Sequence, residues 1–284
     1  MPYATARDGT RIYYKDWGAG RPVALIHGWP LSSDTFDDVA VALAERGYRA
    51  IFHDRRGFGR SDQPFDGYDY DTFADDVSAV LNDAGVRGEV AIAGFSMGGG
   101  EVARFISRKP GRVSHAVLIG SVVPFLLKTP DNPDGAPREV FDGMIEGIKK
   151  DRADFFRDFF PSFYGEGLVS EAVLDDSFRQ AMMAGLRPTL ACVRAFSETD
   201  FRPDLVNFTM PTLVIHGVDD ATVPIDLTGR TAAKTVPGAR LIEYDGAHGI
   251  FASHKDRLIG DLVAFLDGAG SADAPQRASS EAAV

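Results

Sequence analysis

Short apolar segments alternate with amphipathic segments of helical period along most of this 284-residue chain, and this alternation limits its possible folds most strongly. The expected strands span residues 22–26, 48–52, 90–93, 113–119, 212–215 and 240–244. The expected helices span residues 34–46, 72–85, 97–108 and 255–266. Strands that alternate with helices predict an α/β fold, with a mostly parallel sheet flanked by helices. Right-handed crossovers then bring every strand-to-helix turn to one edge of the sheet, where ligands bind.

Two local signals refine this prediction. Near the start of the chain, Asp8-Gly9 stands between two strand-like segments, which predicts an additional hairpin with a two-residue turn. Thr72 is followed three residues later by Asp75, as in a capping box, so we expect the second helix to begin at Thr72.

The alternation is interrupted once in the middle of the chain. Between residues 124 and 205 strand signals vanish, prolines recur and phenylalanines cluster. We therefore expect a helical cap over 124–205, inserted into a core made of residues 1–123 and 206–268. Residues 269–284 are small and polar, and they are expected to form a disordered tail.

The composition excludes several classes of protein. The 30 basic and 41 acidic side chains give a net charge of −11 with no Lys/Arg cluster, which argues against a nucleic-acid partner. The single cysteine, Cys192, allows no internal disulfide and no Cys-x-x-Cys zinc pair, and we expect neither a metal nor a cofactor. The N-terminus lacks a signal-peptide pattern and no apolar run reaches membrane-spanning length, so we expect a cytoplasmic protein without a membrane partner.

The most informative motif is Gly-Phe-Ser-Met-Gly at residues 94–98, between an expected strand and an expected helix. In this context Gly-x-Ser-x-Gly predicts a nucleophile elbow, a sharp turn that exposes the hydroxyl of Ser96. The helix N-terminus that follows adds free N–H groups and a partial positive charge beside the serine. Ser96 is therefore the candidate nucleophile.

A serine nucleophile needs a base, and the chain has six histidines. His248 lies in the small-residue loop Asp-Gly-Ala-His-Gly after the last expected strand, where the base of a Ser…Asp…His chain order falls. His27 and His216, which each follow a strand, are the alternatives, more readily explained as structural residues.

The remaining catalytic groups are predicted less sharply. A carboxylate must orient the histidine, and Asp219 and Asp220 both follow an expected strand, so spacing alone leaves the choice between them open. The oxyanion needs two N–H donors. We expect the backbone N–H of Met97, next to the nucleophile, and that of Trp29, because the following Pro30 has none.

Several motifs together resemble the α/β-hydrolase superfamily, in particular its aryl esterase and cofactor-free haloperoxidase (perhydrolase) branch. These motifs are HGWP, HDRRGFGRSDQP, GFSMGGGEVAR, AFSETDF, HGVDD…VP and YDGAHG. The resemblance implies an α/β-hydrolase fold with Ser96 as nucleophile, His248 as base and Asp220, rather than Asp219, as acid. It also places the oxyanion donors on Trp29 and Met97. Members of this branch are esterases that also acylate hydrogen peroxide, making peracids without a metal.

We therefore predict a serine carboxylesterase with perhydrolase activity, acting on a small or aryl ester, or a carboxylic acid, with water or hydrogen peroxide. A lactamase or amidase, or a ligand receptor without activity, would share the same residues, and the sequence is also compatible with a homo-oligomer. The side chains expected to line the acyl pocket are Phe95, Phe125, Phe159, Phe163 and Phe196. Relatives often carry a proline before the base, and its absence here is expected to loosen or shift the histidine loop.

Overall fold

The computed structural model describes residues 2–268 and contains one eight-stranded sheet with the strand order β1-β2-β4-β3-β5-β6-β7-β8. The strands are β1 (Tyr3–Thr5), β2 (Arg11–Gly18), β3 (Arg21–Ile26), β4 (Tyr48–His53), β5 (Val90–Phe95), β6 (Val113–Ile119), β7 (Thr212–Gly217) and β8 (Arg240–Tyr244). From β4 to β8 all neighbours pair in parallel, and β1 and β2 add two antiparallel strands at one edge. The predicted mostly parallel sheet is therefore confirmed.

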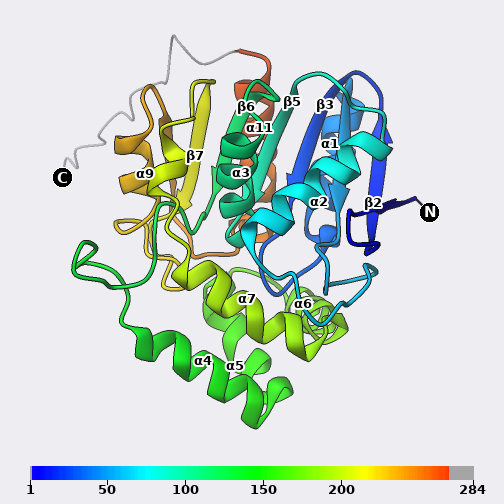
Figure 1. Ribbon diagram of the computed structural model, residues 1–284. Coiled ribbons are helices and arrows are strands. Elements are labelled where there is room, and N and C mark those ends of the chain that lie inside the picture. The colour runs from blue at the N-terminus through cyan, green and yellow to red at the C-terminus, as the bar shows by residue number, and fades with distance from the viewer. Residues whose placement is uncertain (1, 269–284) are drawn as a thin grey trace, which may run out of the picture.

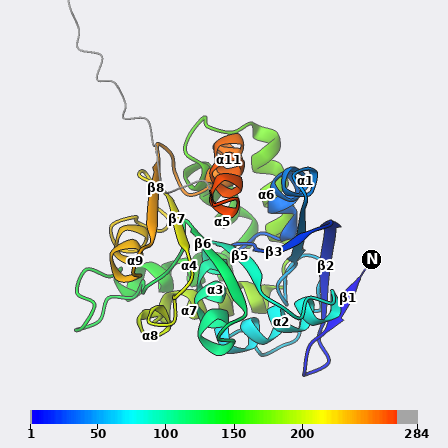
Figure 2. The ribbon, with the colours of Figure 1, turned by 90° about the horizontal axis from the view of Figure 1, so that it is seen from above.

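Helices cover both faces of the sheet, as expected for parallel strands that are buried on both sides. Figure 2 shows α1 (Asp37–Glu45) and α11 (Lys255–Leu266) on one face, and α2 (Tyr70–Asp83) and α3 (Met97–Arg108) on the other. Every residue of the central strand β5 is buried, which explains its continuous run of apolar and small residues.

Residues 124–205, which we call the cap, connect β6 to β7 and contain the helices α4 (Arg138–Lys150), α5 (Arg152–Tyr164), α6 (Glu171–Met183), α7 (Leu186–Glu198) and α8 (Arg202–Leu205). Figure 1 shows α4 to α7 gathered at one end of the sheet, the end toward which β7 points. The cap thus lies over the carboxyl ends of the parallel strands. The tail predicted for residues 269–284 lies outside the described residues.

Two local predictions were wrong in detail. The first hairpin loop has three residues between Ala6 and Thr10, whose backbones are hydrogen-bonded at 2.8 Å, and Gly9 takes a φ of +88°. This is the three-residue loop in which a glycine in the left-handed region follows a turn. The helix α2 begins at Tyr70, because the side chain of Asp69, not that of Thr72, accepts a hydrogen bond from the first turn.

The helix expected over 34–46 is divided in the structure into the 3-10 turn η1 (Ser33–Phe36) and the helix α1. Two further short helices, α9 (Gly229–Thr235) and α10 (Ile250–Ser253), carry too little apolar periodicity to be predicted.

Candidate active site

Ser96 lies in the sharp turn between β5 and α3. Its backbone angles are φ 53° and ψ −119°, and it is the sole non-glycine residue with positive φ within residues 2–268. Such a conformation is strained and persists only where the surroundings hold it in place. Here the N–H of Ser96 donates to the carbonyl of Ile119 at 2.8 Å, and its carbonyl accepts from the N–H of Val122 at 3.3 Å. The hydroxyl is therefore presented at the end of the sheet by a fixed backbone.

The two glycines of the motif allow close backbone contacts at this turn. A Cβ atom on Gly94 would lie 2.3 Å from the carbonyl oxygen of Gly98, and one on Gly98 would lie 2.4 Å from that of Ile26. Both distances are far inside van der Waals contact, so any side chain would push α3 away from the sheet. The spacing Gly-x-Ser-x-Gly is thus a packing requirement of the elbow.

The hydroxyl of Ser96 begins a chain of hydrogen bonds through His248 to Asp220. Ser96 Oγ lies 2.9 Å from Nε2 of His248, and Nδ1 of His248 lies 2.5 Å from Oδ2 of Asp220. An ionised carboxylate only accepts hydrogen bonds, so Nδ1 carries the proton and Nε2 is free to accept the serine proton. The three side chains come from the loops after β5, β7 and β8, and the structure brings together the three residues that the resemblance selected.

Asp220 is held as an anion by three hydrogen bonds and a close contact with His216. Its Oδ1 accepts from the backbone N–H groups of Thr222 and Val223 at 3.0 and 2.7 Å. Its Oδ2 faces Nε2 of His216 at 3.2 Å as well as His248. Burial alone would raise the pKa of Asp220, but His248 and His216 outweigh burial and lower it to about 2. The neighbouring Asp219 is exposed, which resolves the choice that spacing had left open.

The two alternative histidines have other partners. His216 is fully buried, and its Nε2 donates to the carbonyl of Val223 at 2.8 Å while lying 3.2 Å from Oδ2 of Asp220. His27 is also fully buried and bonds the backbone around the loop after β3. Within the described residues neither ring contacts Ser96.

The loop that carries Trp29 lies against the serine. A Cβ atom on Gly28 would lie 2.9 Å from the Cβ of Ser96. In the part of the chain that the structure describes, the backbone N–H groups of Trp29 and Met97 donate to no protein group. Two free donors beside Ser96 are what an oxyanion requires.

A cavity of about 450 Å³ opens on Ser96, between the core and the cap. No charged side chain lines it. Its lining consists of Trp29, Ser96, Val122, Leu126, Ala136, Val140, Phe141, Met144, Phe155, Phe159, Ser162, Phe196, Ala221, Thr222, Val223 and Pro224. The cavity therefore suits an uncharged, largely apolar ligand.

Of the five phenylalanines predicted for the acyl pocket, the structure places Phe159 and Phe196 in the lining. Phe95 and Phe163 pack instead on the ring of His248, with centroids 4.8 and 4.9 Å apart. Phe125 lies outside the lining, beneath the guanidinium of Arg202 at 5.3 Å. These three placements correct the prediction, because the direction in which a side chain points into or away from a cavity depends on tertiary packing that sequence does not show.

Sequence reasoning also missed lining residues from α4 and α5. Phe141 and Met144 lie three positions apart on α4, a spacing that puts both on one helix face. This apolar helix face is the sequence signal that could have identified Phe141 and Met144 as lining residues. Phe155 follows on α5, where it packs on Phe156 and Phe159.

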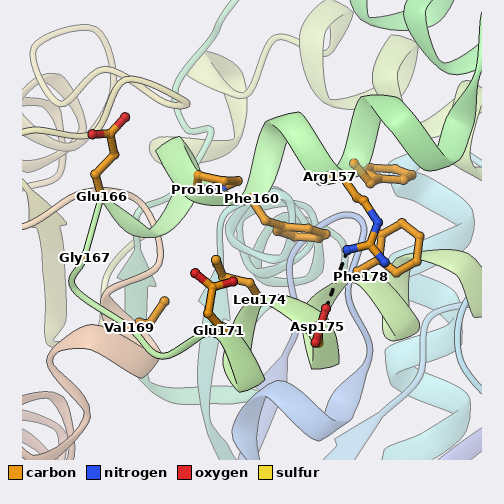
Figure 3. A pocket seen from close by; sticks show the side chains of 12 residues that line it. Arg157, Phe160, Pro161, Glu166, Gly167, Val169, Glu171, Leu174, Asp175 and Phe178 are labelled. Atoms are coloured by element: carbon orange, nitrogen blue, oxygen red, sulfur yellow. Dashed lines mark ion pairs between the residues drawn. The ribbon is translucent and has the colours of Figure 1, made fainter.

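A second cavity, of about 400 Å³, is lined by residues of α5, of α6 and of the loop between them. Figure 3 shows Arg157 of α5 reaching across to Asp175 of α6, to which it is paired at 3.6 Å, beside the ring of Phe178. None of the three hydrogen-bonded residues of the Ser96 chain lines this cavity. It is therefore separate from the candidate active site.

Residues 2–268 contain no group of three or more His, Cys, Asp or Glu side chains that could hold a metal ion. Among their helices, none has the length and apolar character needed to cross a membrane.

This fold, with a serine at a strand-to-helix elbow bonded to a histidine and an aspartate, defines the serine hydrolase type of α/β protein. The family model described as the alpha/beta hydrolase fold matches residues 21–255. The chain belongs to this family, and the predicted fold class is confirmed.

Named relatives cover nearly the whole chain. The non-heme chloroperoxidase of Kitasatospora aureofaciens is 45% identical, over 94% of this chain and 100% of its own. The bifunctional esterase/perhydrolase of Acinetobacter calcoaceticus is 44% identical, over 94% and 99%. Among solved structures, a bromoperoxidase from Bacillus anthracis superposes with a TM-score of 0.89 at 41% identity, over 94% of this chain and 100% of its own.

Proposed function

We propose that this protein is a serine carboxylesterase that also transfers acyl groups to hydrogen peroxide. The observation that carries the proposal is the hydrogen-bonded chain Ser96–His248–Asp220, which ends in an uncharged cavity. The similarity to a chloroperoxidase and to an esterase/perhydrolase supports it.

Acylation begins at Ser96. As Oγ attacks the ester carbonyl carbon, Nε2 of His248 takes the hydroxyl proton, and Asp220 stabilises the imidazolium that forms. The N–H groups of Trp29 and Met97 bind the oxyanion of the tetrahedral intermediate. His248 then gives its proton to the leaving alkoxide, which departs as the alcohol and leaves the acyl group on Ser96.

The second half of the reaction reverses the proton path. His248 takes a proton from water or from hydrogen peroxide, and the resulting oxygen nucleophile attacks the acyl carbon. The bond to Ser96 Oγ breaks, and His248 returns the proton to the serine. Water yields a carboxylic acid and hydrogen peroxide yields a peracid. Neither path requires a metal or an organic cofactor.

The cavity indicates which substrates fit. Its volume of about 450 Å³ and its lack of charged lining favour neutral esters with an apolar or aromatic acyl or alcohol group.

The single cysteine, Cys192, is buried and unpaired, which suits a reducing compartment, and we place the enzyme in the cytoplasm.

The test compares two products of one acyl-enzyme. Wild-type protein is given a small aryl ester with and without hydrogen peroxide, and free acid and peracid are both measured. We expect both products, and the loss of both in Ser96→Ala. Wild-type turnover of the corresponding amides but not of esters would instead identify an amidase, and ligand binding without turnover would identify a receptor.

A further inference from the structure

The ring of His27 has a hydrogen bond on each nitrogen. Its Nε2 lies 2.9 Å from the backbone N–H of Arg55, which can only donate, so Nε2 is the unprotonated acceptor. Its Nδ1 therefore carries the proton and donates to the carbonyl of Gly28 at 2.8 Å. The two partners together select one neutral tautomer.

The carbonyl that His27 binds belongs to the same peptide unit as the N–H of Trp29. A trans peptide is planar, and its C=O and N–H point in opposite directions. The peptide between Gly28 and Trp29 is trans. A donor that fixes the carbonyl of Gly28 therefore also fixes the direction of the Trp29 N–H, and this loop lies beside Ser96. The N–H of Leu31 reaches the same carbonyl at 3.1 Å.

His27 is itself anchored to the helix that follows the nucleophile. Arg55 donates from Nη2 to the backbone carbonyl of His27 at 2.6 Å and from Nε to the carboxylate of Glu101 on α3. Arg55 is 1% exposed and Glu101 is fully buried. The loop after β3 is thus tied, through one buried ion pair, to the helix that begins next to Ser96.

The surroundings also keep the ring neutral. Burial holds the pKa of His27 well below its usual value, and the charge of Arg55 lowers it further. A second proton would fall on Nε2, which would then face the N–H of Arg55 as donor against donor. The tautomer that donates to Gly28 is consequently the stable one.

We propose that His27 is a positioning residue for the oxyanion hole: its Nδ1–H holds the Gly28–Trp29 peptide plane so that the Trp29 N–H points at the oxyanion. The proposal rests on the proposed function, because it assigns a role in the same reaction. A hydrogen bond to a carbonyl also polarises the N–H of its peptide unit, which strengthens that N–H as a donor.

Two substitutions separate the two nitrogens of the ring. In His27→Asn the amide nitrogen takes the place of Nδ1 and keeps the bond to Gly28, while the acceptor for Arg55 is lost. In His27→Gln the amide oxygen takes the place of Nε2 and keeps the bond to Arg55, while a methylene replaces the region of Nδ1. His53→Gln is the matched control, since His53 is also buried and is the last residue of the neighbouring strand β4.

We expect His27→Gln to lower kcat by about 10- to 100-fold, somewhat less than removal of an oxyanion donor, with KM changed by less than about threefold. His27→Asn and His53→Gln should keep kcat within about threefold of wild type. Circular dichroism checks that each variant is folded. Equal losses in His27→Asn and His27→Gln, or full kcat in a folded His27→Gln, would overturn the proposal.

A second measurement does not depend on turnover. Nitrogen-15 spectra of the histidine rings at pH 7 should show a protonated Nδ1 and an unprotonated Nε2 for His27. The opposite tautomer, or protonation of both nitrogens, would overturn the role of His27 even in a fully active esterase. An inactive wild-type protein would overturn the proposed function, while the tautomer would still decide the placement of the Gly28–Trp29 peptide.

Discussion

The core and the cap meet at one cavity but hold their side chains there in different ways. The core supplies Ser96, Asp220 and His248 from the loops that follow β5, β7 and β8, and each has at least two hydrogen bonds to fix it. The cap supplies apolar side chains that are held by ring packing, such as Phe159 against Trp29 at 5.8 Å. Hydrogen bonds fix direction to within narrow limits, whereas apolar packing fixes mainly volume.

This difference separates the two contributions to activity. Changes in the core should reduce the rate for every substrate, because they act on bonds that all substrates share. Changes in the cap should alter the order of preference among substrates while the chemistry persists. Each of the following predictions tests that division.

The largest effect is expected at the two adjacent aspartates. Asp220→Asn removes the charge that orients and stabilises His248, and it should lower kcat by about 10⁴-fold for every ester. Asp219→Asn changes an exposed side chain one position away and should leave kcat within about twofold. Initial rates measured with an acetate ester and with a longer ester give kcat for each of the two variants. A comparable loss in the two variants would contradict the assignment of Asp220.

Phe159 offers the corresponding test in the cap. Phe159→Leu enlarges the cavity next to Ser96, so kcat/KM for a long-chain aryl ester relative to the acetate should rise about tenfold. Phe178→Leu is the control, because this ring also belongs to the cap but lines the second cavity (Figure 3). In Phe178→Leu, kcat/KM for the long-chain aryl ester relative to the acetate should stay within about twofold of the wild-type value. If Phe159→Leu lowered the rate of acetate hydrolysis as much as Asp220→Asn does, the separate roles of core and cap would be contradicted.

Sequence reasoning was most successful for the core, for a physical reason. The expected limits of β6, β8, α3 and α11 coincide with the observed ones, since the period of their apolar residues separates short strands from amphipathic helices. The glycines of the elbow are visible because close packing excludes every side chain there. The choice of Asp220 over Asp219 needed the resemblance, because the spacings of two adjacent residues from any other motif differ by only one position.

The acyl pocket could not be predicted from the sequence in the same way. Phe95 and Phe163 are as apolar as Phe159, but they pack on the ring of His248, and only the packing of β5 and α5 around that ring decides between these positions. The helix α9 was missed because only Gly229 and Ala232 of its seven residues are buried, too few to show a helical period.

A smaller effect is expected at His216, whose Nε2 lies 3.2 Å from Oδ2 of Asp220, the same oxygen that His248 binds. His216→Leu removes this donor and the bond to the carbonyl of Val223, and kcat should fall by about tenfold for all esters alike. His216→Gln keeps a donor at the position of Nε2 and should retain kcat within about threefold. Identical kcat in both folded variants would show that His216 only fills space.

The smallest effect concerns stability and leaves the chemistry aside. Burial raises the pKa of Glu101 to about 7, although Arg55 lowers it, and Oε2 has no hydrogen-bond partner within the described residues. A carboxyl with a raised pKa favours the folded state when protonated, so its contribution is largest below its unfolded value of 4.5 and is lost as the pH rises toward 7.

Urea unfolding between pH 5 and pH 8 measures this contribution. The free energy of unfolding of wild type relative to Glu101→Gln should decrease with rising pH by on the order of 1 to 3 kcal/mol. A difference that is independent of pH would mean that Glu101 stays ionised throughout this range.

Covalent labelling tests the identity of the nucleophile most directly. A fluorophosphonate requires an activated serine, its base and an oxyanion hole, but no particular acyl group. One equivalent should react with wild type and with Phe159→Leu, and peptide mass spectrometry should locate it on Ser96. Asp220→Asn should react far more slowly, and Ser96→Ala should not react. Labelling of another residue, or no labelling of folded wild type, would contradict the proposed mechanism.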